Sequence, residues 1–277
     1  MRIATSTNLV SFNRDGSKTE MTQLIGLYAQ GGFSCLDLNF CEMLNEKSIL
    51  CSDEYGLRTE ELQRLKEKYH LIYNQSHAPY GRDRLAMGIE EGAHLDMLIS
   101  RSITISAQLG IKNIVMHPLC AQDAIIEKNV TYLSPFINQA ERLGVNIALE
   151  NLDSPLEIRD ASTLVALIKR LGSRHCGVCF DFGHAHMNNH DLGKDIATYG
   201  SSLIATHVAD NHGSMDEHLL PFYGTIDWKT CMDSLRNINY TGDLTFECMK
   251  MHANLPPSLK LMAIRDALRI GQYLLTL

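Results

Sequence analysis

The chain has 277 residues, and its 25 lysines and arginines against 32 aspartates and glutamates give a net charge of −7. Apolar residues make up 45% and charged residues 21%, a mixture that excludes a disordered or collagen-like chain. We find no apolar run near the roughly 18 residues of a membrane span, and because residues 2–6 are already strand-like we expect no secretion leader. The acidic balance disfavours non-specific binding to nucleic acid or to an anionic membrane. We therefore expect a cytoplasmic globular protein of one or two domains.

Eight cysteines are scattered along the chain, most of them inside apolar segments. This usage is typical of reduced thiols in the cytosol. Cys176 and Cys179 form a C-x-x-C pair. With no second pair nearby the spacing is weak evidence for zinc, and the apolar surroundings predict that both thiols pack in the core.

Short apolar runs alternate with longer amphipathic runs along the chain. The short runs predict strands over residues 2–6, 35–39, 71–76, 113–117, 146–150, 177–181, 204–208 and 243–247. The longer runs predict helices over residues 18–30, 59–69, 89–109, 125–143, 161–171, 192–199, 228–237 and 259–275. Helix ends are expected at Gly31, Gly110, Gly144, Gly172 and Gly200, and helix starts at Asp160, Asp191 and Asp227.

Eight strand–helix units with short connections predict a parallel sheet. Eight units in one chain favour a closed (β/α)8 TIM barrel, an α/β fold, as a single domain over residues 1–277. An open doubly wound sheet is the alternative. That fold usually carries a glycine-rich phosphate loop after the first strand, and residues 5–9 lack one.

Residues able to bind a metal stand at the ends of six successive predicted strands. They are His77, His117, Glu150, Asp181, His207 and Glu247, and their spacings of 40, 33, 31, 26 and 40 residues each match about one strand–helix repeat. Because active sites of such barrels lie at the carboxyl ends of the strands, we expect these side chains to converge. A carboxylate or imidazole at a buried strand end is costly unless it is paired or bound to a metal.

Glu150, Asp181, His207 and Glu247 together offer mostly oxygen ligands and one imidazole. Such a site suits Mn²⁺, Mg²⁺, Co²⁺ or Zn²⁺ better than a metal that prefers thiolates. A second polar cluster follows the seventh predicted strand, at residues 210–218. We expect its His212 and Glu217 to be solvated loop residues. Further metal or substrate positions could be completed by Asp216 and His218 of this cluster and by three upstream histidines, His77, His117 and His184.

The chain resembles the xylose-isomerase-like TIM barrels, which include sugar isomerases and epimerases and the abasic-site endonucleases with three zinc ions. Four segments carry the resemblance: Leu149-Glu150-Asn151, residues 180–184 (FDFGH), residues 207–211 (HVADN) and residues 216–228 (DEHLLPFYGTIDW). The last is similar to the pattern D-E-H-L-x-P-G-x-G-x-I-D-W of many sugar isomerases. This chain has Phe222 where that pattern has glycine, which puts the identity of the substrate in doubt.

The resemblance implies that Glu150, Asp181, His207 and Glu247 hold one divalent ion. Such an ion polarises the carbonyl of a hydroxy-carbonyl substrate and stabilises the enediolate formed by proton removal. Glu150 and Glu247 are then expected to act as the acid/base pair, one removing the proton and the other returning it. His184 would bind an oxygen of the substrate, which we expect to be a small sugar or a molecule derived from a polyol.

Two other activities stay open. All nine ligand types of a trinuclear nuclease site have counterparts here, which would mean up to three ions, and Tyr80 also resembles the nuclease. Phosphate contacts need basic residues, but Arg82 and Arg84 are the only basic pair nearby, and residues 40–43 after the second strand are not basic. We therefore favour a sugar substrate over nucleic acid. Metal-dependent lyases or dehydratases use the same enediolate chemistry, whereas the complete ligand set disfavours a barrel that only binds.

Candidate residues for substrate contacts are Asn8, Phe12, Asn39, Tyr80, His186 and Tyr223. The lack of a phosphate-binding glycine loop favours an unphosphorylated substrate. Barrels of this kind often form homo-oligomers, but the sequence sets no number.

Overall fold

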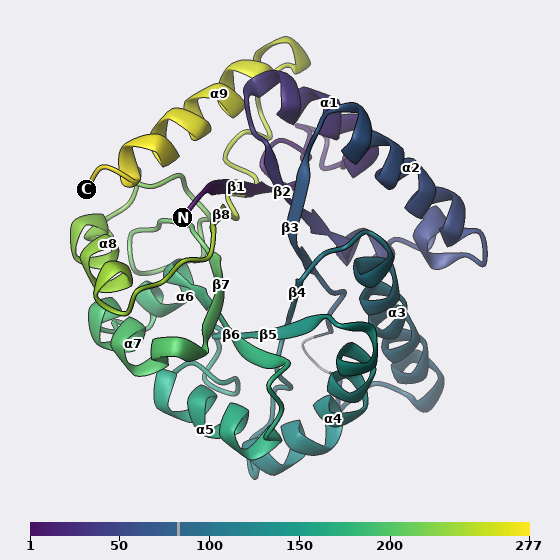
Figure 1. Cartoon of the computed structure of the whole chain (residues 1–277), viewed down its shortest axis with the longest axis vertical. Coiled ribbons are helices and arrows are strands. Elements are labelled where there is room, and N and C mark those ends of the chain that lie inside the picture. Colours follow the sequence, from purple (N-terminus) through teal and green to yellow (C-terminus); the bar gives the residue numbers. More distant parts are fainter. Residues whose placement is uncertain (82–83) are drawn as a thin grey trace.

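The protein is described by a computed structural model that covers residues 1–81 and 84–277. Its eight strands form one parallel sheet in the order β7-β6-β5-β4-β3-β2-β1-β8. The strands are β1 (Ile3–Ser6), β2 (Cys35–Asn39), β3 (Ile72–His77), β4 (Asn113–Met116), β5 (Asn146–Glu150), β6 (Cys176–Asp181), β7 (Leu203–His207) and β8 (Leu244–Phe246). Figure 1 looks down the barrel that these strands form.

The two end strands of the sheet meet and close the barrel. Val208 and Phe246 form a parallel bridge between the ends of β7 and β8. The N–H of Val208 donates to the carbonyl of Thr245 at 2.8 Å, and the N–H of Glu247 donates to the carbonyl of Val208 at 3.1 Å. The expectation of a (β/α)8 TIM barrel is therefore confirmed.

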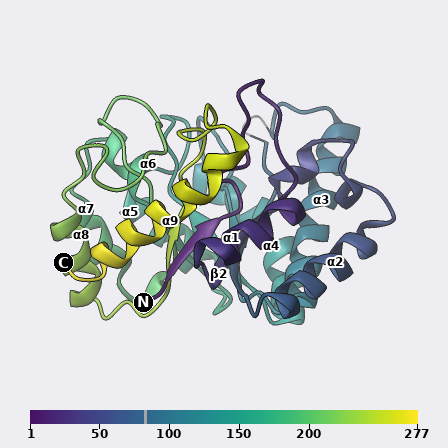
Figure 2. The same ribbon diagram turned by 90° about the horizontal axis from the view of Figure 1, so that it is seen from above.

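Helices surround the strands on the outside (Figure 1). They are α1 (Met21–Gly31), α2 (Tyr55–Lys68), α3 (Ile89–Gln108), α4 (Ile125–Leu143), α5 (Ala161–Leu171), α6 (Phe182–Met187), α7 (Leu192–Tyr199), α8 (Trp228–Asn237) and α9 (Pro257–Leu274). Short 3₁₀ helices cover Phe40–Leu44, Ile49–Cys51 and Gly200–Ser202. In Figure 2 the first strand rises from the N-terminus at the lower side of the view, and long loops gather along the upper side.

Several helix ends follow the predicted capping residues. The side chains of Asp160, Asp191 and Asp227 each accept a hydrogen bond from a backbone N–H of the first turn of α5, α7 and α8. At the first helix the prediction is off: α1 begins at Met21, because Phe12 and Lys18 form an antiparallel bridge that keeps the preceding segment in a hairpin. The helix also continues through Gly31, and Gly32 takes the left-handed conformation with φ of 100°.

Apolar side chains form two separate clusters. The larger one includes Ile25, Leu62, Ile137 and Leu235, which lie on helices, together with outward-facing strand residues. The smaller one consists of Val115, Ala148, Cys179 and Ala205 from four neighbouring strands. Cys179 is buried in it, and its partner in the C-x-x-C pair, Cys176, is half-buried, as expected for packing thiols. Within the described chain, no helix combines the length and apolarity that crossing a membrane requires.

Candidate metal centre

The carboxyl ends of β5 to β8 bring four buried side chains together. Glu150 and Asp181 end β5 and β6, His207 ends β7, and Glu247 follows β8 directly. Each of the four offers one ligand atom, and these atoms all lie within 4.8 Å of one another. Because side chains alternate along a strand, a ligand at the last inward position of each strand points into the same mouth.

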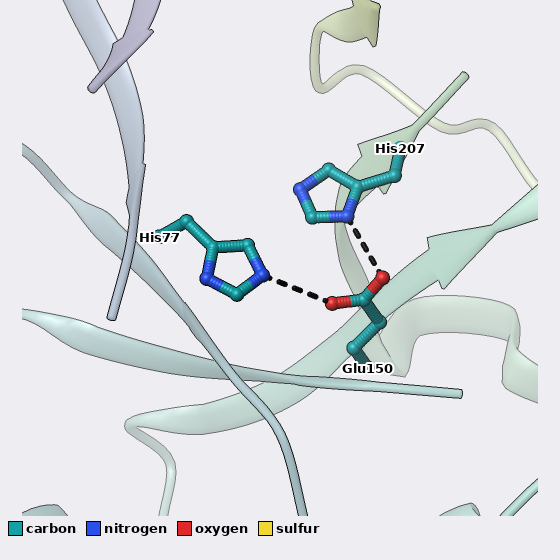
Figure 3. A group of neighbouring side chains, drawn as sticks. All are labelled: His77, Glu150 and His207. Carbon is teal, nitrogen blue, oxygen red and sulfur yellow. Dashed lines mark hydrogen bonds and ion pairs between the residues drawn. The ribbon is translucent and has the colours of Figure 1, made fainter. Parts of the chain in front are cut away.

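His207 contacts each of the three carboxylates of this group, and Figure 3 shows its contact with Glu150. Nδ1 of His207 lies 2.9 Å from Oε1 of Glu150, 3.4 Å from Oε2 of Glu247 and 4.0 Å from Oδ2 of Asp181. Among the described residues, Oδ2 of Asp181 accepts no hydrogen bond although it is buried. Three carboxylates and one imidazole nitrogen around a common point, with a buried oxygen of Asp181 that lacks a hydrogen bond, fit a divalent cation.

Two more histidines face the other oxygen of Glu150. Nε2 of His117 lies 3.1 Å and Nε2 of His77 lies 3.4 Å from Oε2 of Glu150. That oxygen accepts no hydrogen bond within the part of the chain that the structure describes. The two nitrogens are therefore close to it, but the angles are not those of a hydrogen bond. His77, Glu150 and His207 also form a second group with metal-binding spacing.

Asp216 brings the remaining two histidines to the same mouth. Its Oδ2 lies 2.7 Å from Nε2 of His218 and 3.8 Å from Nε2 of His184. The Nδ1–H of His218 donates to the carbonyl of Glu247 at 2.7 Å, and that of His184 donates to the carbonyl of Asn151 at 2.9 Å. These backbone bonds fix both rings with Nε2 toward the site, which is how outer contacts orient metal-binding histidines.

The electrostatics of the site reflect burial and crowding of opposite charges. Burial alone would raise the pKa of the Glu150 carboxyl, but His207 and His117 outweigh it and hold the pKa well below the ordinary value. Burial raises the pKa of Asp181 to about 6, although His184 opposes the shift. Burial would lower the pKa of His207, yet neighbouring Cys179, Glu247 and Glu150 raise it well above the ordinary value. The site therefore holds protons that a cation would displace.

A cavity of about 420 Å³ opens above these residues. Three of the residues expected to contact substrate line it, namely Asn8, Asn39 and Tyr80. The other three expected residues are not part of the cavity lining in the described part of the chain. They are Phe12, His186 and Tyr223. Tyr80 stacks on His117, with ring centroids 4.0 Å apart, so an aromatic face forms one wall beside the histidines.

The loop after β7 is held by one buried carboxylate. Asp210 accepts hydrogen bonds from the backbone N–H groups of Asn211, Phe222 and Ile226 and from Nε1 of Trp228. Phe222 adopts a left-handed conformation with φ of 74°. This conformation strains a residue with a side chain, and it explains why glycine is the usual residue at this point of the pattern.

Other residues of the sequence analysis lie apart from the centre. His212 and Glu217 form an exposed pair on the loop, with Nδ1 of His212 2.8 Å from Oε2 of Glu217. Arg84 is tied to Asp96, with Nε 3.0 Å from Oδ1. Arg82, the other member of the expected basic pair, lies outside the described residues.

Cys41 and Asp37 are among the polar residues of the site region that the sequence analysis did not single out. Cys41 lines the cavity, and its Sγ lies 3.6 Å from Nδ1 of His77. Asp37 is fully buried on β2. The alternation of side chains could have pointed to Asp37, because it precedes the cavity-lining Asn39 by two residues and a charged residue inside a strand is unusual.

The fold and the site together define a TIM barrel with a candidate metal centre at its mouth. The chain belongs to the xylose isomerase-like TIM barrel family, whose profile matches residues 26–269. The uncharacterized protein y4fM of Sinorhizobium fredii is 30% identical over 159 residues, 54% of this chain and 51% of that protein, so the match spans about half of the relative. The D-psicose 3-epimerase of Agrobacterium fabrum is 28% identical over 110 residues, 39% of this chain and 36% of the enzyme.

Solved structures share the fold over nearly the whole chain. A D-psicose 3-epimerase crystallised in the presence of D-fructose has a TM-score of 0.79 and 18% identity, with 99% of both chains covered. The 3-keto-D-glucoside 4-epimerase YcjR of E. coli has a TM-score of 0.73 and 20% identity, with 100% of both chains covered. The IOLI protein with a bound zinc atom has a TM-score of 0.73 and 16% identity, with 99% of this chain and 96% of that chain covered.

Proposed function

We propose that the protein is a divalent-metal-dependent sugar epimerase or isomerase that acts through an enediolate. The observation that supports this proposal best is the convergence of Glu150, Asp181, His207 and Glu247, with ligand atoms within 4.8 Å of one another below a cavity of about 420 Å³. The epimerases among its relatives and structural neighbours point to a sugar as the substrate class.

The four residues would hold Mn²⁺, Mg²⁺, Co²⁺ or Zn²⁺. When bound, such an ion polarises the substrate carbonyl and makes the neighbouring C–H more acidic. The zinc in the IOLI protein shows that a barrel of this fold can carry one.

Glu150 and Glu247 are the acid/base pair of the proposal. They lie on β5 and just after β8, so a sugar between them would expose opposite faces of one carbon to the two carboxylates. One carboxylate takes the proton, and the other delivers a proton to the opposite face, which inverts the carbon. A single carboxylate acting twice would instead shift the carbonyl between neighbouring carbons. His184, with Nε2 toward the mouth, would donate to a substrate oxygen.

Incubation of the metal-loaded protein with a panel of free and phosphorylated ketoses in D₂O tests the proposal. We expect deuterium at a sugar carbon together with formation of an epimer or an aldose, both detected by NMR. Exchange with loss of water or of a substituent would replace the proposal by a lyase or dehydratase. No exchange with any sugar, in a protein shown to carry metal, would contradict it.

A second activity has its own support. His77 and His117 lie near Oε2 of Glu150, and His184 and His218 lie near Asp216. Together with Asp181, His207 and Glu247 these residues make a set of nine, which could hold up to three ions as in abasic-site endonucleases. A duplex with one abasic site, incubated with the zinc-loaded protein, tests this alternative. Strand nicking without deuterium exchange into sugars would favour the nuclease, and exchange without nicking the epimerase.

A further inference from the structure

The hairpin between β1 and α1 brings a lysine to the cavity. Phe12 and Lys18 pair as an antiparallel bridge, and Figure 2 shows the hairpin in purple on the upper side of the view, where the long loops gather. Lys18 lines the cavity of about 420 Å³ that Glu150 and Glu247 also line. This volume is within the range of sites that enclose a whole small molecule. One ligand can therefore face the candidate metal centre and Lys18 at the same time.

Lys18 supplies the one ammonium group of the cavity lining, counted over the described residues, and no arginine is among them. Its Nζ lies 4.5 Å from the centre of the Phe12 ring, and this cation–π contact holds the side chain at the rim. In the part of the chain that the structure describes, the lysines with a carboxylate at ion-pair distance are Lys128 and Lys229. The charge of Lys18 therefore has no counter-charge from the described protein.

The carboxylates around Lys18 are occupied by other partners. Asp15, on the same hairpin, accepts hydrogen bonds from the backbone N–H of Ser17 at 3.0 Å and from its hydroxyl at 2.6 Å. Oε2 of Glu20 lies 2.8 Å from Nη2 of Arg58. Glu42 accepts from the first backbone N–H of α1 and from a serine hydroxyl. The other described carboxylates of the lining belong to the candidate metal centre, so the ammonium group is left for a ligand.

Two further lysines approach the same hairpin from the segment around the start of α9, which is yellow in Figure 2. Nζ of Lys250 lies 5.8 Å from the centre of the Phe12 ring, and Nζ of Lys260 donates to Oδ1 of Asn13 at 2.7 Å. Neither has a carboxylate at ion-pair distance among the described residues. In a chain with a net charge of −7, this grouping concentrates positive charge on one side of the mouth, where it attracts anions.

We propose that the substrate is a ketose with an anionic group, a carboxylate or a phosphate, and that Lys18 binds this group while the carbonyl faces the metal centre. The inference rests on the proposed function and names the class of sugar within it. A neutral sugar would leave the ammonium group without a counter-charge, whereas an anionic group forms a charge-assisted hydrogen bond with it. Lys18 is thus the residue that determines specificity, and the other two lysines strengthen the field around it.

Calorimetry in the presence of Mn²⁺ tests the inference on the full chain with three ligands. They are D-fructose, D-fructose 6-phosphate and 5-keto-D-gluconate, which carries a carboxylate at the end opposite its ketone. We expect at least one of the two anions to bind roughly 10-fold more tightly than D-fructose, and the preferred anion identifies the group. The preference should shrink at about 0.5 M NaCl, because salt screens an exposed lysine. Wild type that binds all three equally, or none, would overturn the inference.

Three variants assign the preference to Lys18. Lys18→Gln should lose it, and Lys18→Arg should keep it, because the positive charge remains. Lys47→Gln is the matched control: Lys47 is exposed between two 3₁₀ helices beside the cavity and is not part of the described lining, so this variant should also keep the preference.

The remaining outcomes separate the alternatives. A lower melting temperature of Lys18→Gln with an unchanged preference would show that Lys18 only stabilises the hairpin. An equal loss of affinity for all three ligands would show a contact with a sugar hydroxyl instead of an anion. Either result overturns the inference. Preference for an anion without deuterium exchange into any of the ligands would support the role of Lys18 and contradict the proposed epimerase or isomerase activity.

Discussion

Nδ1 of His207 lies 2.9 Å from Oε1 of Glu150, and both side chains are buried. At this distance the nitrogen carries a proton that it donates to the carboxylate. A metal ion needs the lone pair of the same nitrogen, so binding has to displace that proton. The contact therefore marks a position where protonation and metal binding compete.

Metal binding at pH 7 is expected to release at least one proton per ion. The raised pKa of His207, held up by Cys179, Glu247 and Glu150 against the effect of burial, keeps the ring protonated in the metal-free protein. Calorimetric titration with Mn²⁺ in buffers of different ionisation enthalpy measures the number released. Identical heats in all buffers would show that the Nδ1 proton is not displaced.

Conversion of the sugar is expected to need both glutamates. Glu150→Gln and Glu247→Gln each remove one proton-transfer group, which typically costs about 10²- to 10⁴-fold in rate. Glu217→Gln is a matched control, because Glu217 belongs to the neighbouring loop but pairs with the exposed His212. Its rate should stay near that of wild type. Full activity of Glu150→Gln or of Glu247→Gln would show that the substituted residue does not belong to the acid/base pair.

Removal of the metal is expected to destabilise the fold. At a metal concentration about 100 times the dissociation constant, binding to the native state alone contributes about 2.7 kcal/mol. For a chain of this size that corresponds to a difference in melting temperature on the order of 5–10 °C. Scanning calorimetry with and without EDTA measures it. The Asp181→Asn variant should show a smaller difference, and an unchanged melting temperature in wild type would argue against a buried metal centre.

Much of the barrel could be predicted from the sequence, because strands and helices of this chain have clear periodicity. The predicted bounds 35–39, 125–143 and 161–171 agree with β2, α4 and α5. Short elements without a period were missed, such as the six-residue helix α6, which Asp181 caps through the N–H of His184. The start of α1 was missed because a pairing between Phe12 and Lys18 fixes it, and such pairing has no local signal.

The site could be predicted only at the level of strand ends. Position in the repeat was enough to expect His77, His117, Glu150, Asp181, His207 and Glu247 near one another, and the structure brings them together. It did not lead to Asp37, because that residue stands two positions before the end of its strand, and only the alternation of side chains would have pointed to it. Nor did sequence show which nitrogen of each histidine faces the site, since that depends on backbone carbonyls such as those of Ala78 and Asn151.

The metal-free protein is expected to lose stability above neutral pH. Although burial favours the neutral ring, Asp216 and Glu247 raise the pKa of His218 from 6.5 to about 9. A raised pKa in the folded state stabilises the fold fully below the unfolded value of 6.5, and this contribution disappears as the pH rises through about 9. The shift corresponds to about 3 kcal/mol at most.

Urea unfolding of EDTA-treated protein between pH 6 and 10 measures this contribution. Wild type should lose more stability over that range than His218→Gln, which cannot gain a proton. The difference between the two curves isolates His218 from the other histidines with raised pKa. Parallel curves would mean that the pair of His218 and Asp216 does not stabilise the metal-free fold.

The carboxylate of Asp210 is expected to be essential for the loop that carries Asp216 and His218. It accepts three backbone hydrogen bonds and one from Trp228, so Asp210→Ala leaves four donors without their acceptor. Since each buried donor without a partner costs about 1–3 kcal/mol and water recovers part of that cost, we expect a loss of roughly 3–5 kcal/mol in urea unfolding. Asp227→Ala removes only the exposed cap of α8 and should cost about 1 kcal/mol. A similar loss in both variants would show that the loop keeps its shape through its other contacts, such as the backbone pairing of Asp210 with Leu219.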